Sequence, residues 1–135
     1  MERLEQRLNV SYRALETLNE VLSLPSPSRI ERDASIQRFE YTFEAVWKTG
    51  KQYLFDYEGL DIGSPKGVIR ASFSVGLFNE EETAMGLELV DDRNLSVHTY
   101  NEALAEMIFG RLPQYAVLMK KWLDEIKQRM EGNHP

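Results

Sequence analysis

The sequence predicts an all-α protein folded as an antiparallel up-and-down bundle of four or five helices. Apolar residues recur every three or four positions over several long segments, which is the period of an amphipathic helix. No segment alternates apolar and polar residues as a half-buried strand would. Short stretches with proline, glycine and serine separate the segments, as in bundles with short loops. We expect residues 1–135 to form a single domain, because 135 residues is the length of one ordinary domain.

Two helices are expected in the first part of the chain. The stretch "SLPSPS" interrupts the first apolar pattern, so the first helix should run from about Leu4 to near Leu24. The second helix should begin near Arg29 and continue for about four turns or more. The apolar positions are Leu4, Leu8, Leu15, Leu18 and Leu22 in the first helix, and Ile36, Phe39, Phe43, Val46, Trp47, Leu54 and Tyr57 in the second.

The third and fourth helices are predicted from their start signals. Ser64 followed by Pro65 is typical of an N-cap and a first helical residue, after the glycines of "EGLDIGSPKG". Asn79 with Glu82 three positions later resembles a capping box, so the fourth helix should run from Glu80 to about His98. The expected apolar positions are Ile69, Phe73 and Leu77 in the third helix, and Met85, Leu89 and Leu95 or Val97 in the fourth.

A last long helix is expected near the C-terminus, with a frayed tail at residues 131–135. Pro113 should kink or restart this helix, because proline lacks the backbone donor that a helix interior needs. Its apolar positions are Leu104, Ile108, Leu112, Tyr115, Leu118, Trp122 and Ile126. Aromatic residues at helical spacing, here Phe39, Phe43 and Trp47 with Tyr115 and Trp122, are expected to pack in the core and not to form a ligand site.

The composition excludes several classes of protein. A net charge of -6 argues against a general nucleic-acid coat protein, which needs an excess of Lys and Arg, but it leaves a local RNA site open. The absence of cysteine excludes disulfides, thiolate zinc sites and a cysteine nucleophile. The start "MERLEQRLNV" lacks an apolar signal core, and no apolar run reaches membrane-spanning length, so we expect a cytoplasmic protein without a membrane segment.

The stretch "DDRNLSVHTYN" holds the residues best suited to chemistry. His98 can transfer a proton near neutral pH, and Arg93 can hold a phosphate with its planar guanidinium group. Asn94 can orient either group, while Tyr100 can bind, stack on a base or be modified. These side chains suit metal-free RNA cleavage, in which the adjacent 2′-hydroxyl attacks the phosphorus and no protein nucleophile is needed. The same pattern is also typical of a solvated helix end with a few ion pairs.

Arg93 and His98 cannot meet within one regular helix. Each residue advances by about 100°, so the two side chains point roughly 140° apart. They converge if the helix ends near His98, or if two copies of the helix meet across a dimer axis and form a composite site. Both alternatives are open from the sequence.

Two further cations lie in the first turns of the expected third helix. Lys66 and Arg70 are one turn apart, where the helix N-terminus also favours anions. They are candidates for binding an RNA phosphate or an acidic partner, and a solvated surface is the alternative. No metal site and no cofactor are expected, because the chain has only two histidines, His98 and His134.

Several separated blocks resemble a known family. "DDRNLSVHTYNE", "GSPKGVIRASFSVGLF" and "RDASIQRFEYTFEAVWK" are similar to the HEPN-domain, HepT-like proteins, also called nucleotidyltransferase substrate-binding proteins. The resemblance covers roughly Leu4 to Ile126. The family hallmark is Arg, a polar residue, further residues and His, here Arg93, Asn94 and His98, followed by a HepT-type tyrosine that matches Tyr100.

The resemblance implies a homodimer with this motif in a cleft, and a separate MNT-type nucleotidyltransferase as partner. It leaves open a metal-independent toxin ribonuclease, silenced when Tyr100 is adenylylated, and a non-catalytic subunit that presents a substrate. The chain is not itself a nucleotidyltransferase, because its only Gly-Ser, Gly63-Ser64, is not followed by Asp-x-Asp. One departure counts against activity, since acidic neighbours of the motif would repel RNA unless they pair internally: Glu88, Asp91, Asp92 and Glu102.

Overall fold

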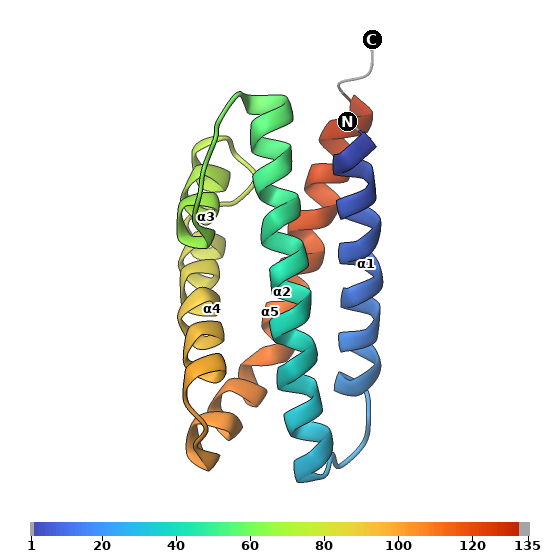
Figure 1. Ribbon diagram of the computed structural model, residues 1–135, viewed down its shortest axis with the longest axis vertical. Helices are drawn as coiled ribbons and strands as arrows, with labels where there is room; N and C mark the ends of the chain where they lie inside the picture. The colour runs from blue at the N-terminus through green and yellow to red at the C-terminus, as the bar shows by residue number, and fades with distance from the viewer. Residues whose placement is uncertain (1, 133–135) are drawn as a thin grey trace.

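The computed structural model describes residues 2–132, and this part of the chain forms five helices and no strand. The helices are α1 (Glu2–Leu22), α2 (Arg29–Glu58), α3 (Pro65–Ser74), α4 (Glu80–His98) and α5 (Glu102–Gly132). The predicted all-α bundle is confirmed. Successive long helices α1, α2, α4 and α5 run in opposite directions, and the short α3 packs beside α4 (Figure 1). No helix in residues 2–132 combines the length and the apolar character that crossing a membrane requires.

The start of each inner helix is fixed by local sequence. The Ser64 side chain accepts a hydrogen bond from the Gly67 amide, with Pro65 as the first helical residue, as predicted. Asn79 and Glu82 form the predicted capping box at α4. A second capping box joins Ser28 and Glu31 at the start of α2, where the sequence pattern alone gave only an approximate boundary.

Several predicted apolar positions near the ends of α3 and α4 differ from the structure. The third helix ends at Ser74, and Leu77 is buried beyond the turn in which Gly76 has a positive φ of 82°. Phe73 is 44% exposed. On α4, the apolar positions Leu95 and Val97 are both exposed, because the inward side of this helix is occupied by other residues: Gly86, Leu89, Val90 and Asp92.

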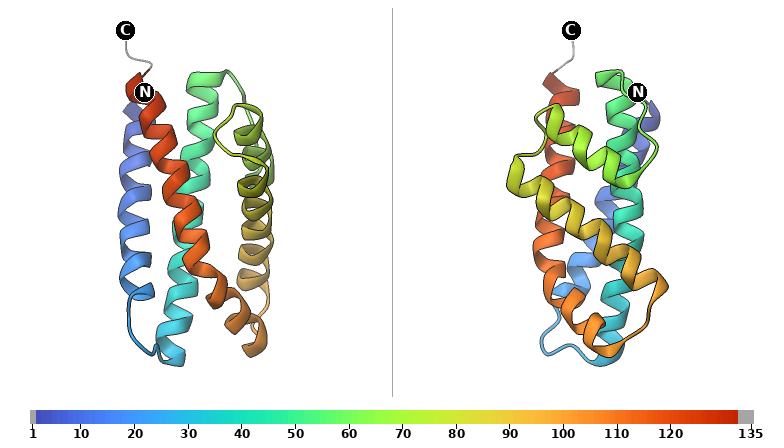
Figure 2. Two further views of the ribbon diagram at one scale, coloured as in Figure 1. Left: turned by 180° about the vertical axis from the view of Figure 1, so that it is seen from behind. Right: turned by 90° about the vertical axis from the view of Figure 1, so that its left-hand side faces the viewer.

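The helix α5 continues through Pro113 instead of restarting. The proline ring lies on the exposed side of the helix, and the orange part of α5 that contains it changes direction (Figure 2). The predicted kink is therefore a bend within one helix. Residues 131 and 132 of the predicted frayed tail are helical, and residues 133–135 lie outside the described residues.

The aromatic residues at helical spacing pack in the core, as predicted. Phe39 of α2 stacks on Tyr115 of α5 with ring centroids 5.7 Å apart. Phe78, after α3, contacts Trp122 with centroids 4.9 Å apart. Figure 2 shows α3 and α4 lying together against the α2 and α5 side of the bundle, and α1 touches neither of them. The core therefore has two parts that share α2 and α5.

The helix α2 packs closely against Trp122 at Gly50. A Cβ atom at this position would lie 2.6 Å from Trp122 Cζ2 and 3.1 Å from Val68 Cγ1. We expect Gly50→Ala to lower the free energy of unfolding by about 1–3 kcal/mol, because the indole ring cannot retreat in a packed interior. Urea denaturation followed by circular dichroism measures the change.

Gly110 of α5 is the matched control for this prediction. It also lies inside a long helix, but a Cβ atom there would meet nothing within 4 Å. Gly110→Ala should raise the free energy of unfolding by up to about 1 kcal/mol through helix propensity alone. Equal effects of the two substitutions would contradict the close packing of Gly50 against Trp122.

Candidate functional site

The predicted motif lies at one end of the bundle. Residues 91–98 form the last turns of α4, and the extended Thr99 begins a short link to α5. The start of α2 lies at the same end (Figure 1). The motif is therefore presented at the end of the bundle where α4 ends and α2 and α5 begin, away from the start of α1.

The Arg93 side chain turns toward α2. Its Nη1 lies 3.4 Å from Glu44 Oε2, and its guanidinium carbon lies 5.5 Å from the centroid of the Phe43 ring. The side chain is 20% exposed, and its buried Nε finds no hydrogen-bond acceptor within residues 2–132. Glu44 also accepts hydrogen bonds from Trp47 and Lys48. Burial of the Glu44 carboxyl raises its pKa. The hydrogen bonds from Trp47 and Lys48 and the charge of Arg93 outweigh burial, so the pKa of Glu44 lies below its ordinary value.

His98 and Asn94 are exposed on the surface of α4. Within residues 2–132, neither side chain forms a hydrogen bond or an ion pair, and none joins Arg93 to His98. The helix ends at His98, but Arg93 is held against α2, so the end of the helix does not bring the two together. A site that uses both residues therefore requires the second alternative, a dimer in which one copy supplies Arg93 and the other supplies His98.

Tyr100 stands on the link between α4 and α5 and is 71% exposed. Its hydroxyl donates a 2.8 Å hydrogen bond to Glu102 Oε1, which raises the pKa of Tyr100. The buried Arg32 donates two further bonds of 3.0 Å to the Glu102 carboxylate. Hydrogen bonds from Arg32 and Tyr100 lower the pKa of Glu102 to about 2. The hydroxyl is thus both accessible and oriented.

The low pKa of Glu102 predicts a pH dependence of stability. The pKa of about 2 in the folded protein lies below the ordinary value of 4.5, so the ionised carboxylate stabilises the fold above pH 4.5. That contribution falls as the pH drops from 4.5 toward 2. The stability difference between the parent and Glu102→Gln should therefore be constant near neutral pH and shrink in this acidic window, as urea denaturation at several pH values can measure.

Glu16→Gln is the control for the pH dependence. Glu16 is exposed on α1 and forms no hydrogen bond or ion pair within residues 2–132. The parent and Glu16→Gln should keep parallel stability curves over the same pH range. A difference for Glu102→Gln that does not change between pH 4.5 and 2 would show that the carboxylate is not held by Arg32.

Three of the four acidic neighbours of the motif pair with cations, which lowers the barrier that they present to RNA. Lys66 Nζ lies 2.7 Å from Asp91 Oδ1, and Arg111 Nη1 lies 3.0 Å from Asp92 Oδ2. Glu102 is bound by Arg32 as described. The repulsion expected from the sequence is therefore reduced at three of the four carboxylates.

Asp92 belongs to a buried polar network that the sequence pattern did not reveal. Its side chain is 4% exposed and accepts bonds from Arg111 Nη1 and from the Tyr115 hydroxyl. The Tyr115 hydroxyl is also 3.0 Å from Glu88 Oε1. Burial and the bond to Asp92 raise the pKa of Tyr115 well above its ordinary value. This network ties the motif-bearing half of α4 to α5.

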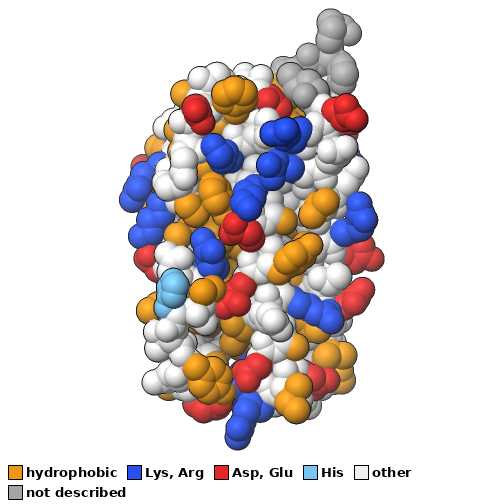
Figure 3. Space-filling model, viewed as in Figure 1, with side chains coloured by type: hydrophobic (Ala, Val, Ile, Leu, Met, Phe, Trp, Pro, Cys, Tyr) orange, Lys and Arg blue, Asp and Glu red, His pale blue; other side chains and the backbone are white. Residues whose placement is uncertain are grey.

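The two cations predicted on α3 have different surroundings. Lys66 is bound to Asp91, while Arg70 is exposed and has no ion-pair partner within residues 2–132. Figure 3 shows that Lys and Arg side chains gather over the upper half of the face formed by α2 and α3. This local concentration contrasts with the net charge of -6 for the chain. Anion binding by Lys66 and Arg70 stays a prediction.

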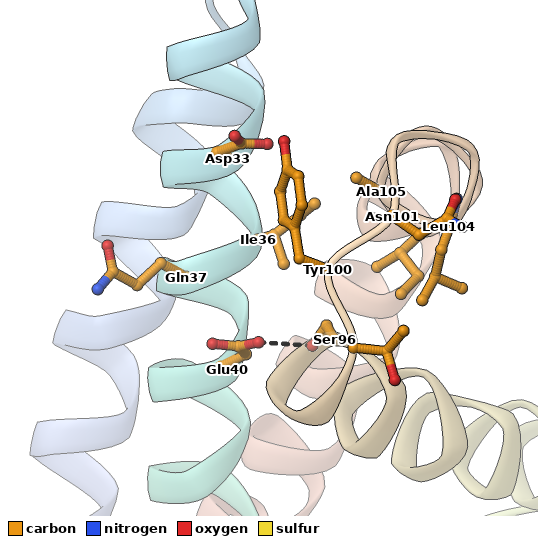
Figure 4. A pocket seen from close by; sticks show the side chains of 11 residues that line it. Asp33, Ile36, Gln37, Glu40, Ser96, Tyr100, Asn101, Leu104 and Ala105 are labelled. Atoms are coloured by element: carbon orange, nitrogen blue, oxygen red, sulfur yellow. Dashed lines mark hydrogen bonds between the residues drawn. The ribbon is translucent and has the colours of Figure 1, made fainter.

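A pocket of about 290 Å³ opens between the first turns of α2 and the link that carries Tyr100 (Figure 4). Ser96, Thr99 and Asn101, on either side of His98 and Tyr100, belong to its lining. No cation lines the pocket. Within residues 2–132, no group of three His, Asp or Glu side chains is arranged to hold a metal ion.

A family model covers most of the chain. The model of the family described as "Nucleotidyltransferase substrate binding protein like" matches residues 6–128. The chain belongs to this family. The resemblance inferred from the motif blocks is confirmed, and the matched range includes Arg93, His98 and Tyr100. No curated protein sequence matches the chain.

Solved structures related to this family member share its fold. A crystal structure of a protein from Thermus thermophilus is 56% identical, with a TM-score of 0.83, over 86% of this chain and 98% of that chain. HI0074 from Haemophilus influenzae, described as a substrate binding domain of a nucleotidyltransferase, is 21% identical, with a TM-score of 0.73, over 89% and 98% of the chains. A mutant toxin-antitoxin MntA-HepT structure is 14% identical, with a TM-score of 0.78, over 95% and 99%.

Proposed function

We propose that this family member is the ribonuclease subunit of a HepT/MNT-type toxin–antitoxin pair and cleaves RNA without a metal ion. The observation that carries the proposal is the exposed His98, free of protein partners within residues 2–132, at the end of a helix whose neighbouring carboxylates Asp91 and Asp92 are paired with cations. Because Asp91 and Asp92 are paired with cations, they repel an approaching RNA phosphate less than free carboxylates would. The fold shared with a toxin-antitoxin MntA-HepT structure is consistent with this reading.

In the proposed reaction the RNA supplies its own nucleophile. The 2′-hydroxyl oxygen forms a bond to phosphorus, the bond from phosphorus to the 5′-oxygen breaks, and the products are a 2′,3′-cyclic phosphate and a 5′-hydroxyl. His98 acts as the general acid or base for the protons that leave the 2′-oxygen and reach the 5′-oxygen. Arg93 stabilises the phosphate charge, and Asn94 orients the reacting groups.

The proposed site is composite and requires a homodimer. Arg93 is held by Glu44 on the side of α4 that faces α2, whereas His98 is exposed, so one chain does not present both to one phosphate. A twofold axis near the end of α4 would bring His98 of one copy toward the Arg93 region of another. The exposed apolar side chains of Leu95 and Val97 support such an interface.

The proposed regulator is an MNT-type nucleotidyltransferase on a separate chain. The regulator would transfer a nucleotide to Tyr100. The Tyr100 oxygen attacks the α-phosphorus of a nucleoside triphosphate, the bond from the α-phosphorus to the oxygen that bridges to the β-phosphate breaks, and pyrophosphate leaves. The exposed and oriented hydroxyl of Tyr100 supports its role as the acceptor, and its proton passes to solvent or to Glu102. A nucleotide on Tyr100 would add negative charge two residues from His98 and hinder RNA binding.

The test is incubation of the purified protein with single-stranded RNA in the presence of a metal chelator, followed by analysis of the product ends. We expect fragments with a 2′,3′-cyclic phosphate and a 5′-hydroxyl. Cleavage that requires an added divalent ion, or that leaves a 5′-phosphate, would contradict the proposed mechanism. Mass spectrometry of the intact chain beforehand establishes whether Tyr100 already carries a nucleotide.

A second candidate function is a non-catalytic subunit that binds and presents a substrate to the nucleotidyltransferase. The family description and the pocket of about 290 Å³ beside Tyr100 favour this reading. It predicts a stable complex with the nucleotidyltransferase and no RNA cleavage by unmodified protein at any concentration. Cleavage that disappears on replacement of His98 would exclude it.

A further inference from the structure

The pocket beside Tyr100 has a carboxylate at each end of one wall. Asp33 and Glu40 both line it and are seven residues apart on α2, which is two helical turns or about 10 Å. Figure 4 shows Asp33 at the Tyr100 end of the wall and Glu40 at the Ser96 end. The pocket thus has an acidic group at both ends and no cation in its lining.

Each of these carboxylates has an oxygen that no residue in the described part of the chain occupies. Asp33 accepts bonds from Arg32 through Oδ1 at 3.1 and 2.9 Å, which leaves Oδ2. Glu40 accepts a 2.6 Å bond from the Ser96 hydroxyl through Oε2, which leaves Oε1. Arg32 partly neutralises Asp33, so the negative charge of the pocket is concentrated at Glu40.

The space between the two carboxylates is apolar. Ile36, Leu104 and Ile108 form part of its surface, and the ring of Tyr100 lies across its opening toward α2 (Figure 4). An alkyl stem can pack against these side chains while its charged head reaches a carboxylate, as the side chains of Lys and Arg do. The ring face of Tyr100 also favours a cation.

We propose that this pocket binds the side chain of an arginine or lysine presented by a partner protein. The acidic ends disfavour phosphates and carboxylates, and a neutral group would leave the charge of Glu40 without a partner. A long basic side chain satisfies the acidic end and the apolar middle together. A partner chain bound here lies beside the Tyr100 hydroxyl. The identity of this partner as the nucleotidyltransferase rests on the proposed function.

The test uses a single basic side chain as the probe. Nα-acetyl-arginine amide is titrated into the unmodified protein, and backbone amide shifts of Ser96, Thr99 and Asn101 are followed by NMR. The neutral isostere Nα-acetyl-citrulline amide is the control ligand. We expect saturable shifts at these three residues with arginine, and binding of citrulline weaker by about threefold to fivefold or more.

Glu40→Gln tests the proposed acidic contact without removing the bond to Ser96, because the glutamine side-chain oxygen can still accept it. This variant should weaken arginine binding by about threefold to fivefold, while Glu16→Gln on the exposed side of α1 should leave it unchanged. Equal binding of arginine and citrulline, or equal binding by the parent and Glu40→Gln, would overturn the proposal. Tighter binding of adenosine than of arginine would overturn it in favour of a nucleobase site.

The outcome is independent of the ribonuclease proposal. Arginine binding is measured without RNA and without the nucleotidyltransferase, whereas RNA cleavage needs His98 and not Glu40. Arginine binding without RNA cleavage would support the pocket proposal and contradict the ribonuclease proposal. RNA cleavage without arginine binding would contradict only the pocket proposal.

Discussion

His98→Ala is expected to lower the rate of RNA cleavage by at least about 100-fold, the usual contribution of a positioned general acid or base. The stability of the bundle should not change, because His98 is exposed and forms no bond within residues 2–132. The measurements are initial cleavage rates on one RNA with chelator present, and thermal unfolding of both proteins. Loss of the rate without loss of stability would identify a role in the reaction.

The chain offers a matched control in its other histidine. His134→Ala removes the same chemical group from a position beyond the described residues and should leave the cleavage rate unchanged. If His98→Ala cleaves RNA as fast as the parent and unfolds at the same temperature, the ribonuclease proposal fails. The substrate-presenting function would then be the better reading of the same motif.

Asp92→Ala is expected to lower the free energy of unfolding by about 3 kcal/mol. This value is the lower end of the usual range for removing one partner of a buried ion pair. The substitution leaves Arg111 and the Tyr115 hydroxyl without their shared acceptor. The lower end applies because Arg111 is partly exposed and water can hydrate its charge. Urea denaturation at neutral pH measures the loss.

The adjacent Asp91 is the control for this prediction. It has the same side chain on the same helix, but it is exposed and pairs with Lys66 at the surface. Asp91→Ala should change the free energy of unfolding by less than about 1 kcal/mol. Similar losses for the two substitutions would mean that the buried network with Arg111 does not stabilise the link between α4 and α5.

These two neighbours illustrate what sequence patterns cannot distinguish. Asp91 and Asp92 are chemically identical, and the direction of each depends on how α4 is rotated against α5. The apolar pattern assigned Leu95 or Val97 to the core, whereas the structure buries Asp92 and exposes both apolar residues. A buried carboxylate is stable only with its partners, and the partners Arg111 and Tyr115 lie 19 and 23 residues away.

The sequence by itself determined the helices, most of their starts and the candidate residues. Helical periodicity and caps are local properties, so the N-caps Ser64 and Asn79 could be read from a few neighbouring residues. The types of residue in the motif likewise pointed to phosphate chemistry. The core role of the aromatic residues followed from the same periodicity.

The tertiary structure decided the surroundings of the candidate residues. It directs Arg93 toward Glu44, orients the Tyr100 hydroxyl through Glu102 and Arg32, and opens a pocket between α2 and the link after α4. Each of these features joins residues that are distant in sequence or separated by a loop. Their relative positions depend on how the helices pack together, and a periodic pattern records only which side of a helix is apolar.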